Sequence, residues 1–202
     1  MQKEVHRYKV IIVGNGGVGK TSFITRYVHN EYLKSYKPTL GVDFFVKKLD
    51  IDNGSRVHLH LWDIQGQECA MNMTSTFYRK ANAAILMFDI TQRKTFEDIR
   101  IWKQDIDTKI FRDTCPCILL GNKSDLKAMQ EVEESEMKNL CQELGFVHYS
   151  EISVKQNFHV KESMNILVEN LMDNTEGIFD SVVSQTEGIV HVNDNVQKRC
   201  CA

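Results

Sequence analysis

Short apolar stretches alternate along this chain with longer segments whose apolar residues recur at helical spacing. Compact apolar runs, too short for helices, predict strands at residues 8–13, 83–88, 117–120 and 146–150. Residues 57–62 alternate Val, His, Leu, His, Leu and Trp, which indicates a strand with one buried face.

A further strand is predicted at residues 44–51. The dipeptide Asn53-Gly54 lies between it and the strand at 57–62. This dipeptide tolerates positive φ angles and favours a tight hairpin turn. The strand at 44–51 is therefore expected to run antiparallel to its partner, at one edge of a sheet.

Three segments carry an apolar stripe at helical spacing. They cover residues 96–110, 137–144 and 160–171. Thr95 with Asp98 resembles a capping box for the first helix, and Gly145 is a plausible C-cap residue for the second. Strands alternating with helices predict an α/β fold, with a mostly parallel six-stranded sheet, one antiparallel edge strand and helices on both faces.

The periodic pattern ends near residue 174, and residues 175–202 are polar with little periodicity. We expect one folded domain over residues 1–174 and a flexible tail over residues 175–202. The chain has 202 residues, of which 42% are hydrophobic and 26% are charged. These fractions suit an ordinary soluble domain with a proper core.

Charge and cysteine usage narrow the class of protein further. The net charge of −2 provides no field that favours nucleic acid, so no nucleic-acid partner is expected. Residues 1–8 carry no signal-peptide core and no run of 18 apolar residues exists, which predicts a cytosolic protein with reduced thiols. Cys115 and Cys117 lack a second pair at zinc spacing, so we interpret them, with Cys69 and Cys141, as small hydrophobes.

Residues 14–21, Gly-Asn-Gly-Gly-Val-Gly-Lys-Thr, match the phosphate-binding pattern G-x-x-x-x-G-K-[ST]. Glycines let backbone N–H groups approach a triphosphate, and the helix expected from about Lys20 points its positive end at the anion. Lys20 would bridge the terminal phosphates and the Thr21 hydroxyl would hold Mg²⁺. The alternative is a glycine-rich turn, which the strand-to-helix context disfavours. The nucleotide contacts predicted here are Asn15, Gly16, Gly17, Val18, Gly19, Lys20, Thr21 and Ser22.

Asn122-Lys123-Ser124-Asp125 follows the strand at 117–120, at the same edge of the sheet as the phosphate loop. The Asp125 carboxylate can accept two hydrogen bonds from guanine and would stay unpaired against adenine. The Lys123 stem can lie over the base plane. Ser153-Val154-Lys155 would close the base pocket with a backbone N–H, although either segment alone could be a surface turn.

Taken in order, these motifs resemble those of the Ras superfamily of small GTPases, over about residues 8–174. The matching motifs are residues 14–21, Thr39 after Pro38, residues 63–68, residues 122–125 and residues 153–155. The resemblance implies a P-loop NTPase G domain that binds GTP or GDP with Mg²⁺. It also implies a switch, in which the γ-phosphate pulls two loops inward and hydrolysis releases them.

The resemblance assigns further roles around the phosphates. Thr39 would ligate Mg²⁺ when GTP is bound, and Asp63 would hold the ion through water. The Gly66 N–H would touch the γ-phosphate. Gln67 would orient the attacking water, with Lys20 as the second catalytic residue. On the same basis, Tyr32 and Tyr36 are expected to contact the nucleotide.

Within the superfamily the chain is similar to Rab proteins. Residues 40–44, Leu-Gly-Val-Asp-Phe, are near the Rab first-switch signature Ile-Gly-Val-Asp-Phe. Phe44, Trp62 and Phe77 match the aromatic triad that displays the switch state to effectors, although each ring alone could be ordinary core. Ile64, residues 102–105 and residues 153–155 also resemble the Rab subgroup that serves lysosome-related organelles and trans-Golgi traffic.

The chain ends with Cys200-Cys201-Ala202, which resembles the Rab double-geranylgeranylation signal. Two lipids give stable anchoring, whereas one binds only marginally; the alternative is two incidental exposed thiols. We expect a monomeric GTP/GDP switch in vesicle trafficking on the cytoplasmic face of an endomembrane, with a cytosolic pool. Its partners would be an exchange factor, a GTPase-activating protein, effectors, and prenylation escort and extraction proteins.

The sequence departs from the family pattern in the second switch. Gln65 stands where most of the family has alanine, which predicts slower hydrolysis or an altered GTP/GDP preference. Cys69-Ala70 replaces the usual Arg-Phe and changes the surface that partners meet. Two alternatives remain: a GTP-bound binding module with little hydrolysis, and a P-loop small-molecule kinase, against which residues 122–125 argue.

Overall fold

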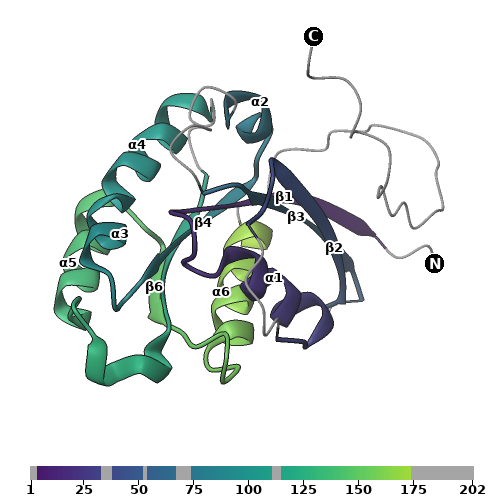
Figure 1. Ribbon diagram of the computed structural model, residues 1–202. Coiled ribbons are helices and arrows are strands. Elements are labelled where there is room, and N and C mark those ends of the chain that lie inside the picture. The colour runs from purple at the N-terminus through teal and green to yellow at the C-terminus, as the bar shows by residue number, and fades with distance from the viewer. Residues whose placement is uncertain (1–3, 33–37, 52–53, 67–73, 111–114, 174–202) are drawn as a thin grey trace, which may run out of the picture.

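The computed structural model describes residues 4–32, 38–51, 54–66, 74–110 and 115–173 (Figure 1). Within these ranges a six-stranded sheet has the order β2-β3-β1-β4-β5-β6. The β2–β3 pair is antiparallel, and the other neighbouring strands are parallel. The predicted α/β fold, a mostly parallel sheet with one antiparallel edge strand, is confirmed.

The strands lie close to where the apolar runs predicted them, and most extend further at their ends. Their bounds are β1 Val5–Val13, β2 Val42–Asp50, β3 Arg56–Ile64, β4 Ala83–Asp89, β5 Cys117–Asn122 and β6 His148–Glu151. Every residue of β4 and β5 is buried, whereas β3 alternates between buried and half-buried positions. This matches a sheet whose centre is covered on both sides and whose β2–β3 edge is open on one side.

The turn between β2 and β3 includes Gly54, whose φ is 86°. The Gly54 N–H donates to the Ile51 carbonyl at 2.9 Å, and the Ile51 N–H donates to the Ser55 carbonyl at 2.9 Å. Asn53 lies outside the described residues. The antiparallel strand pair that the Asn-Gly dipeptide predicted is present.

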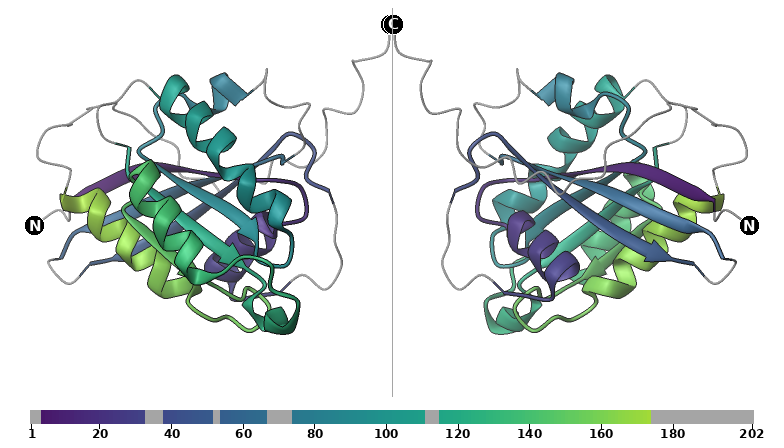
Figure 2. Two further views of the ribbon diagram at one scale, coloured as in Figure 1. Left: turned by 90° about the vertical axis from the view of Figure 1, so that its left-hand side faces the viewer. Right: turned by 90° about the vertical axis from the view of Figure 1, so that its right-hand side faces the viewer.

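Helices cover both faces of the sheet (Figures 1 and 2). The helices are α1 Lys20–His29, α2 Thr74–Tyr78, α3 Arg93–Glu97, α4 Ile99–Lys109, α5 Glu134–Leu144 and α6 Val160–Asp173, with a 3₁₀ helix at Ser124–Met129. Helices α1 and α6 contribute to one buried apolar cluster, and α3, α4 and α5 contribute to the other. The core therefore has two layers, one on each side of the sheet.

The helix predicted over residues 96–110 is two helices, which meet at Asp98. The capping box proposed for Thr95 and Asp98 is wrong. The Thr95 hydroxyl donates to the Gln92 carbonyl at 2.8 Å and accepts from the Asp89 N–H at 3.0 Å, and the Asp98 side chain caps neither helix. By contrast, Gly145 is the C-cap residue of α5, with φ 68°.

Helix α6 ends at Asp173, and the proposed tail at 175–202 lies outside the described residues. The boundary between domain and tail therefore stays a prediction. No helix in the described ranges is both long enough and apolar enough to cross a membrane.

Candidate functional site

The phosphate loop connects the end of β1 to the start of α1, and two of its glycines are required by close contacts. Gly14 has φ 138°, and a Cβ there would lie 2.1 Å from the Met87 carbonyl oxygen. Gly19 has φ 103°, and a Cβ there would lie 2.4 Å from Asn122 Nδ2. L-residues rarely adopt either conformation, so the spacing of these glycines follows from the shape of the loop.

Lys20 is buried beneath this loop. Its ammonium donates to the carbonyls of Gly14 and Asn15, each at 2.8 Å. Burial lowers the pKa of Lys20 to about 8, although the nearby charge of Asp63 opposes the shift. Gly66 lies close to the Lys20 ammonium, because a Cβ at Gly66 would lie 2.3 Å from Lys20 Nζ. A cation held among carbonyls at the start of a helix is suited to binding phosphate.

Three oxygen-bearing side chains meet beside Lys20. The Thr21 hydroxyl donates to Asp63 Oδ2 at 2.5 Å and lies 2.9 Å from the Thr39 hydroxyl, which lies 3.4 Å from Asp63 Oδ2. Asp63 is fully buried, and burial raises its pKa, although the hydrogen bond from Thr21 and the charge of Lys20 oppose this. Its Oδ1 is buried with no hydrogen-bond partner among the described residues. Such hard oxygen donors around a buried carboxylate fit Mg²⁺.

Asn122 lines the cavity and also holds two neighbouring segments together through its side chain. Its Nδ2 donates to the Val18 carbonyl at 2.9 Å, and its Oδ1 accepts from the Val154 N–H at 3.1 Å. The side chain therefore ties the phosphate loop to the segment after β6. Lys123 follows with φ 71°, and its ammonium forms an ion pair with Asp89 Oδ2 at 2.6 Å.

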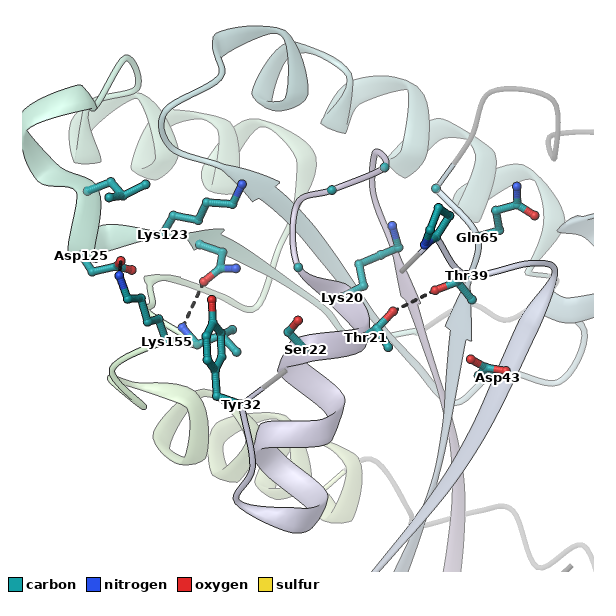
Figure 3. A pocket seen from close by; sticks show the side chains of 18 of the residues that line it. Lys20, Thr21, Ser22, Tyr32, Thr39, Asp43, Gln65, Lys123, Asp125 and Lys155 are labelled. Carbon is teal, nitrogen blue, oxygen red and sulfur yellow. Dashed lines mark hydrogen bonds and ion pairs between the residues drawn. The ribbon is translucent and has the colours of Figure 1, made fainter. Parts of the chain in front are cut away.

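Asp125 is fixed by the segment after β6. Its Oδ1 accepts from the Ser153 hydroxyl at 2.6 Å, and its Oδ2 lies 3.8 Å from Lys155 Nζ. Figure 3 shows Asp125 and Lys155 at one end of the cavity, with Lys20, Thr21 and Thr39 toward the other. A carboxylate in this position can accept two hydrogen bonds from a guanine base whose phosphates reach Lys20.

These groups surround one cavity of about 830 Å³. The predicted nucleotide contacts that line it are Gly16, Gly17, Gly19, Lys20, Thr21, Ser22, Tyr32, Thr39, Gly66, Asn122, Lys123, Asp125, Val154 and Lys155. Pro38, Leu40, Asp43, Gln65 and Leu126 line it as well. Ser153 supports Asp125 from behind, Val18 is buried in the core and Asn15 turns its side chain toward Asp98. Tyr36, Gln67, Cys200 and Cys201 lie outside the described residues.

Comparison with known proteins identifies the family. The sequence model of the Ras family matches residues 9–173. Ras-related protein Rab-7L1 of Rattus norvegicus is 42% identical and covers 91% of this chain and 90% of its own length. The chain is a Rab-type small GTPase of the Ras family. Rab-7L1 of Homo sapiens is 39% identical, with 97% of this chain and 98% of its own covered, and Rab-32 of Sus scrofa is 38% identical, with 97% and 89% covered.

As a Rab-type small GTPase, the protein binds guanine nucleotides, hydrolyses GTP and acts as a switch in membrane trafficking. The P-loop small-molecule kinase considered from the sequence is ruled out by this family membership.

Phe44, Trp62 and Phe77 of this GTPase lie together outside the cavity. The ring centroids are 4.4 Å apart between Phe44 and Trp62, and 6.4 Å apart between Trp62 and Phe77. Phe44 is 61% exposed, so its ring is accessible at the surface. Lys9 Nζ lies 3.5 Å from the Trp62 ring centroid and holds the indole from the neighbouring strand.

Several contacts of this GTPase were not predicted from the sequence. Gln65, which lines the cavity, exchanges two hydrogen bonds with Gly41. Asn15 contacts Asp98 and Trp102, which are more than 80 residues away in the chain. Gln65 departs from the family pattern, but nothing in the sequence indicates its partner.

Proposed function

We propose that this GTPase holds GTP or GDP with Mg²⁺ in the cavity between the phosphate loop and Asp125, and acts as a membrane-anchored switch with slow hydrolysis. The observation that carries the proposal is the meeting of Thr21, Thr39 and Asp63 oxygens beside the buried Lys20 ammonium. One divalent cation and one polyphosphate would satisfy these groups together.

Each element around the phosphates has a separate task in this proposal. When bound, Mg²⁺ would supply positive charge that offsets the charge of the terminal phosphates. Lys20 would turn its ammonium from the carbonyls of Gly14 and Asn15 toward the β- and γ-phosphates. Thr21 and Thr39 would offer their hydroxyl oxygens to the ion, and the Asp63 carboxylate would hold one of its waters.

Recognition of the base rests on Asp125 and its supports. Ser153 and Lys155 keep the carboxylate aimed into the cavity, so that it meets the ring N–H and exocyclic amine of guanine without moving. Asn122 sets the distance between the phosphate loop and this end of the cavity by its two hydrogen bonds. Lys123 and Tyr32 supply the faces against which the nucleotide would lie.

The switch follows from which segments meet at the γ-phosphate end. Thr39 belongs to the segment before β2, and Gly66 belongs to the segment after β3. Thr39 reaches Thr21 at 2.9 Å, and Gly66 packs against Lys20. Loss of the γ-phosphate would remove the anion that draws both segments inward, so hydrolysis would release them and change the surface around Phe44, Trp62 and Phe77.

Slow hydrolysis is proposed from the position of Gln65. Its backbone N–H donates to the Gly41 carbonyl, and its side-chain oxygen accepts from the Gly41 N–H, both at 2.9 Å. These two bonds join the Thr39 segment to the segment that continues to Gln67. Gln67 must align the attacking water, so restricting the start of its segment would slow that alignment. If the restriction were complete, the protein would be a GTP-bound binding module that recruits effectors.

The C-terminus supplies the proposed anchor. Geranylgeranyl chains on Cys200 and Cys201 would hold the folded domain, residues 1–174, to a membrane through the tail at 175–202. The Rab proteins to which the chain is similar support an endomembrane; its lysosome-related or trans-Golgi type is part of our proposal. We propose the cytoplasmic face of that membrane, with a cytosolic pool of monomer held by escort and extraction proteins.

Single-turnover hydrolysis of bound GTP tests this proposal. The parent protein is expected to hydrolyse GTP at or below about 10⁻⁴ s⁻¹, the order of unassisted hydrolysis in such switches. Gln67→Leu should abolish the reaction, and a chelator of Mg²⁺ should speed nucleotide release. A fast intrinsic rate would contradict slow hydrolysis, and a release rate indifferent to the chelator would contradict the metal site. A rate of zero that a GTPase-activating protein cannot raise would favour the binding module.

A further inference from the structure

The phosphate loop contains few side chains that could fix its position. Between residues 14 and 19 only Asn15 and Val18 have side chains beyond hydrogen. Val18 is fully buried in the core. Asn15 is therefore the polar anchor of a loop that is otherwise glycine, and the contacts of its amide decide how firmly that half of the loop is held.

Both ends of the Asn15 amide are occupied by residues of the α3–α4 region. Its Nδ2 donates to Asp98 Oδ2 at 2.7 Å, and its Oδ1 accepts from the Trp102 indole N–H at 2.8 Å. Trp102 is 3% exposed and lies in α4, packed in the core against the sheet. Asp98 is 9% exposed, and Lys94 Nζ holds its other oxygen at 2.7 Å. One donor and one acceptor at opposite ends of an amide fix its orientation.

The backbone of the same residue contacts the proposed nucleotide machinery. The Asn15 carbonyl accepts from Lys20 Nζ at 2.8 Å. The side chain of Asn15 thus reaches helices on one side while its carbonyl faces the phosphate-binding ammonium on the other. A shift of the α3–α4 junction would move the loop and the carbonyl that orients Lys20.

We propose that Asn15, Asp98 and Trp102 position the phosphate loop, so that the junction of α3 and α4 sets how long the nucleotide stays bound. This rests on the proposed function, in which the loop holds the nucleotide phosphates. Asp98 and Trp102 touch no nucleotide in this account and act through Asn15. The junction would be a control point separate from Thr39 and Gly66 of the two switch segments.

Exchanging the amide and the carboxylate gives a sharp test. Asn15→Asp would place a second carboxylate 2.7 Å from Asp98, where like charges in a largely buried site repel. The double variant Asn15→Asp with Asp98→Asn rebuilds the pair with donor and acceptor exchanged. Trp102 can still donate to residue 15, and Lys94 can still approach the amide oxygen of residue 98.

The measurement is the dissociation rate of a fluorescent GDP analogue from the full-length protein with Mg²⁺ present. Asn15→Asp is expected to speed dissociation by about tenfold or more, as loss of a charge-assisted hydrogen bond would, and the double variant should return to within about threefold of the parent. Asp98→Asn alone should speed dissociation by an intermediate factor. Asp107→Asn is the matched control, because it removes a carboxylate of α4 that pairs with Lys103.

Each outcome bears on the proposal. Equal rates in the parent, Asn15→Asp and Asp98→Asn, or a double variant as fast as Asn15→Asp, would overturn the positioning role. If Asn15→Asp does not fold, Asp98→Asn against Asp107→Asn decides, and equal rates in those two would overturn it. A parent protein that retains no GDP analogue would instead overturn the proposed function, and with it this inference.

Discussion

Gln65 and Gly41 form a two-bond bridge that extends the β2–β3 pairing by one residue pair beyond Val42 and Ile64. The Gln65 N–H donates to the Gly41 carbonyl, and the Gly41 N–H donates to the Gln65 side-chain oxygen, each at 2.9 Å. The first bond needs only backbone and any residue could form it. The second requires an acceptor on the side chain, which the alanine of the usual family pattern lacks.

Replacement of Gln65 by alanine is expected to speed hydrolysis. Gln65→Ala removes one hydrogen bond of about 1 kcal/mol, so single-turnover GTP hydrolysis should rise by about threefold to tenfold. Gln65→Met keeps the length of the side chain without a strong acceptor. It should resemble the alanine variant if the hydrogen bond matters, and the parent if bulk alone matters. Equal hydrolysis rates and equal GTP and GDP affinities in the parent and in Gln65→Ala would contradict the prediction.

Base selection should change with Asp125. Asp125→Asn replaces an acceptor by a group that can donate, so GDP affinity should fall by about 10²-fold or more, while binding of xanthosine diphosphate, which has an oxygen at position 2, should improve. Equilibrium titration with both nucleotides measures the change. Asp43→Asn, a carboxylate at the other end of the cavity, should keep the guanine preference. An Asp125→Asn protein that still prefers GDP would contradict the assignment.

The affinity for nucleotide is expected to fall at alkaline pH. Burial lowers the pKa of Lys20 to about 8, and bound phosphates would raise it again because they favour the charged form. Below pH 8 Lys20 is charged with or without nucleotide, so affinity should be flat. Above pH 8 binding must take up a proton, so affinity should fall by up to about tenfold per pH unit.

Two lysine variants separate this effect from other titrations. Lys20→Met should bind GDP weakly at every pH and show no such slope. Burial also lowers the pKa of Lys9 to about 8, but Lys9 lies against Trp62 outside the cavity. Lys9→Met should therefore keep the slope of the parent. The same slope in Lys20→Met as in the parent would remove Lys20 as the cause.

Membrane recovery should depend on the last two cysteines. A variant with Cys200→Ser and Cys201→Ser cannot accept a geranylgeranyl group, so it should move to the soluble fraction when cells are fractionated. Cys115→Ser, in the folded domain, should stay with the membranes as the parent does. If the double variant were still recovered with membranes, another feature of the chain would have to provide the anchor.

The sequence was sufficient for the order and the type of most elements, because most strands contain an apolar run or an alternating pattern and the long helices carry an apolar stripe. The sequence predicted the elements poorly where they are short and where two helices meet. The stripe over residues 96–110 continues through Asp98, so it could not show that α3 ends and α4 begins there. Helix α2 and the 3₁₀ helix at Ser124–Met129 are too short to develop a periodic pattern.

Local motifs located the cavity, but the contacts that brace it could not be predicted from them. Asn122 reaches Val18 across 104 positions of sequence, and Asn15 reaches Asp98 across 83. Such pairs depend on how the sheet places its strand ends. Neither the spacing nor the composition of the sequence indicates that Val18 is the partner of Asn122 or that Asp98 is the partner of Asn15. The predicted nucleotide contacts of Asn15 and Asn122 stay predictions, and the structure adds hydrogen bonds from both side chains to other parts of the chain.

The central claim is that this cavity holds a guanine nucleotide with Mg²⁺. The most direct measurement is release of the nucleotide from the purified protein by denaturation, followed by its chromatographic identification and quantification. The account predicts about one GDP or GTP per chain, lost on dialysis against a chelator of Mg²⁺. Purified, folded protein that carries no nucleotide and takes up none, or that takes up ATP in preference to GTP, would contradict it.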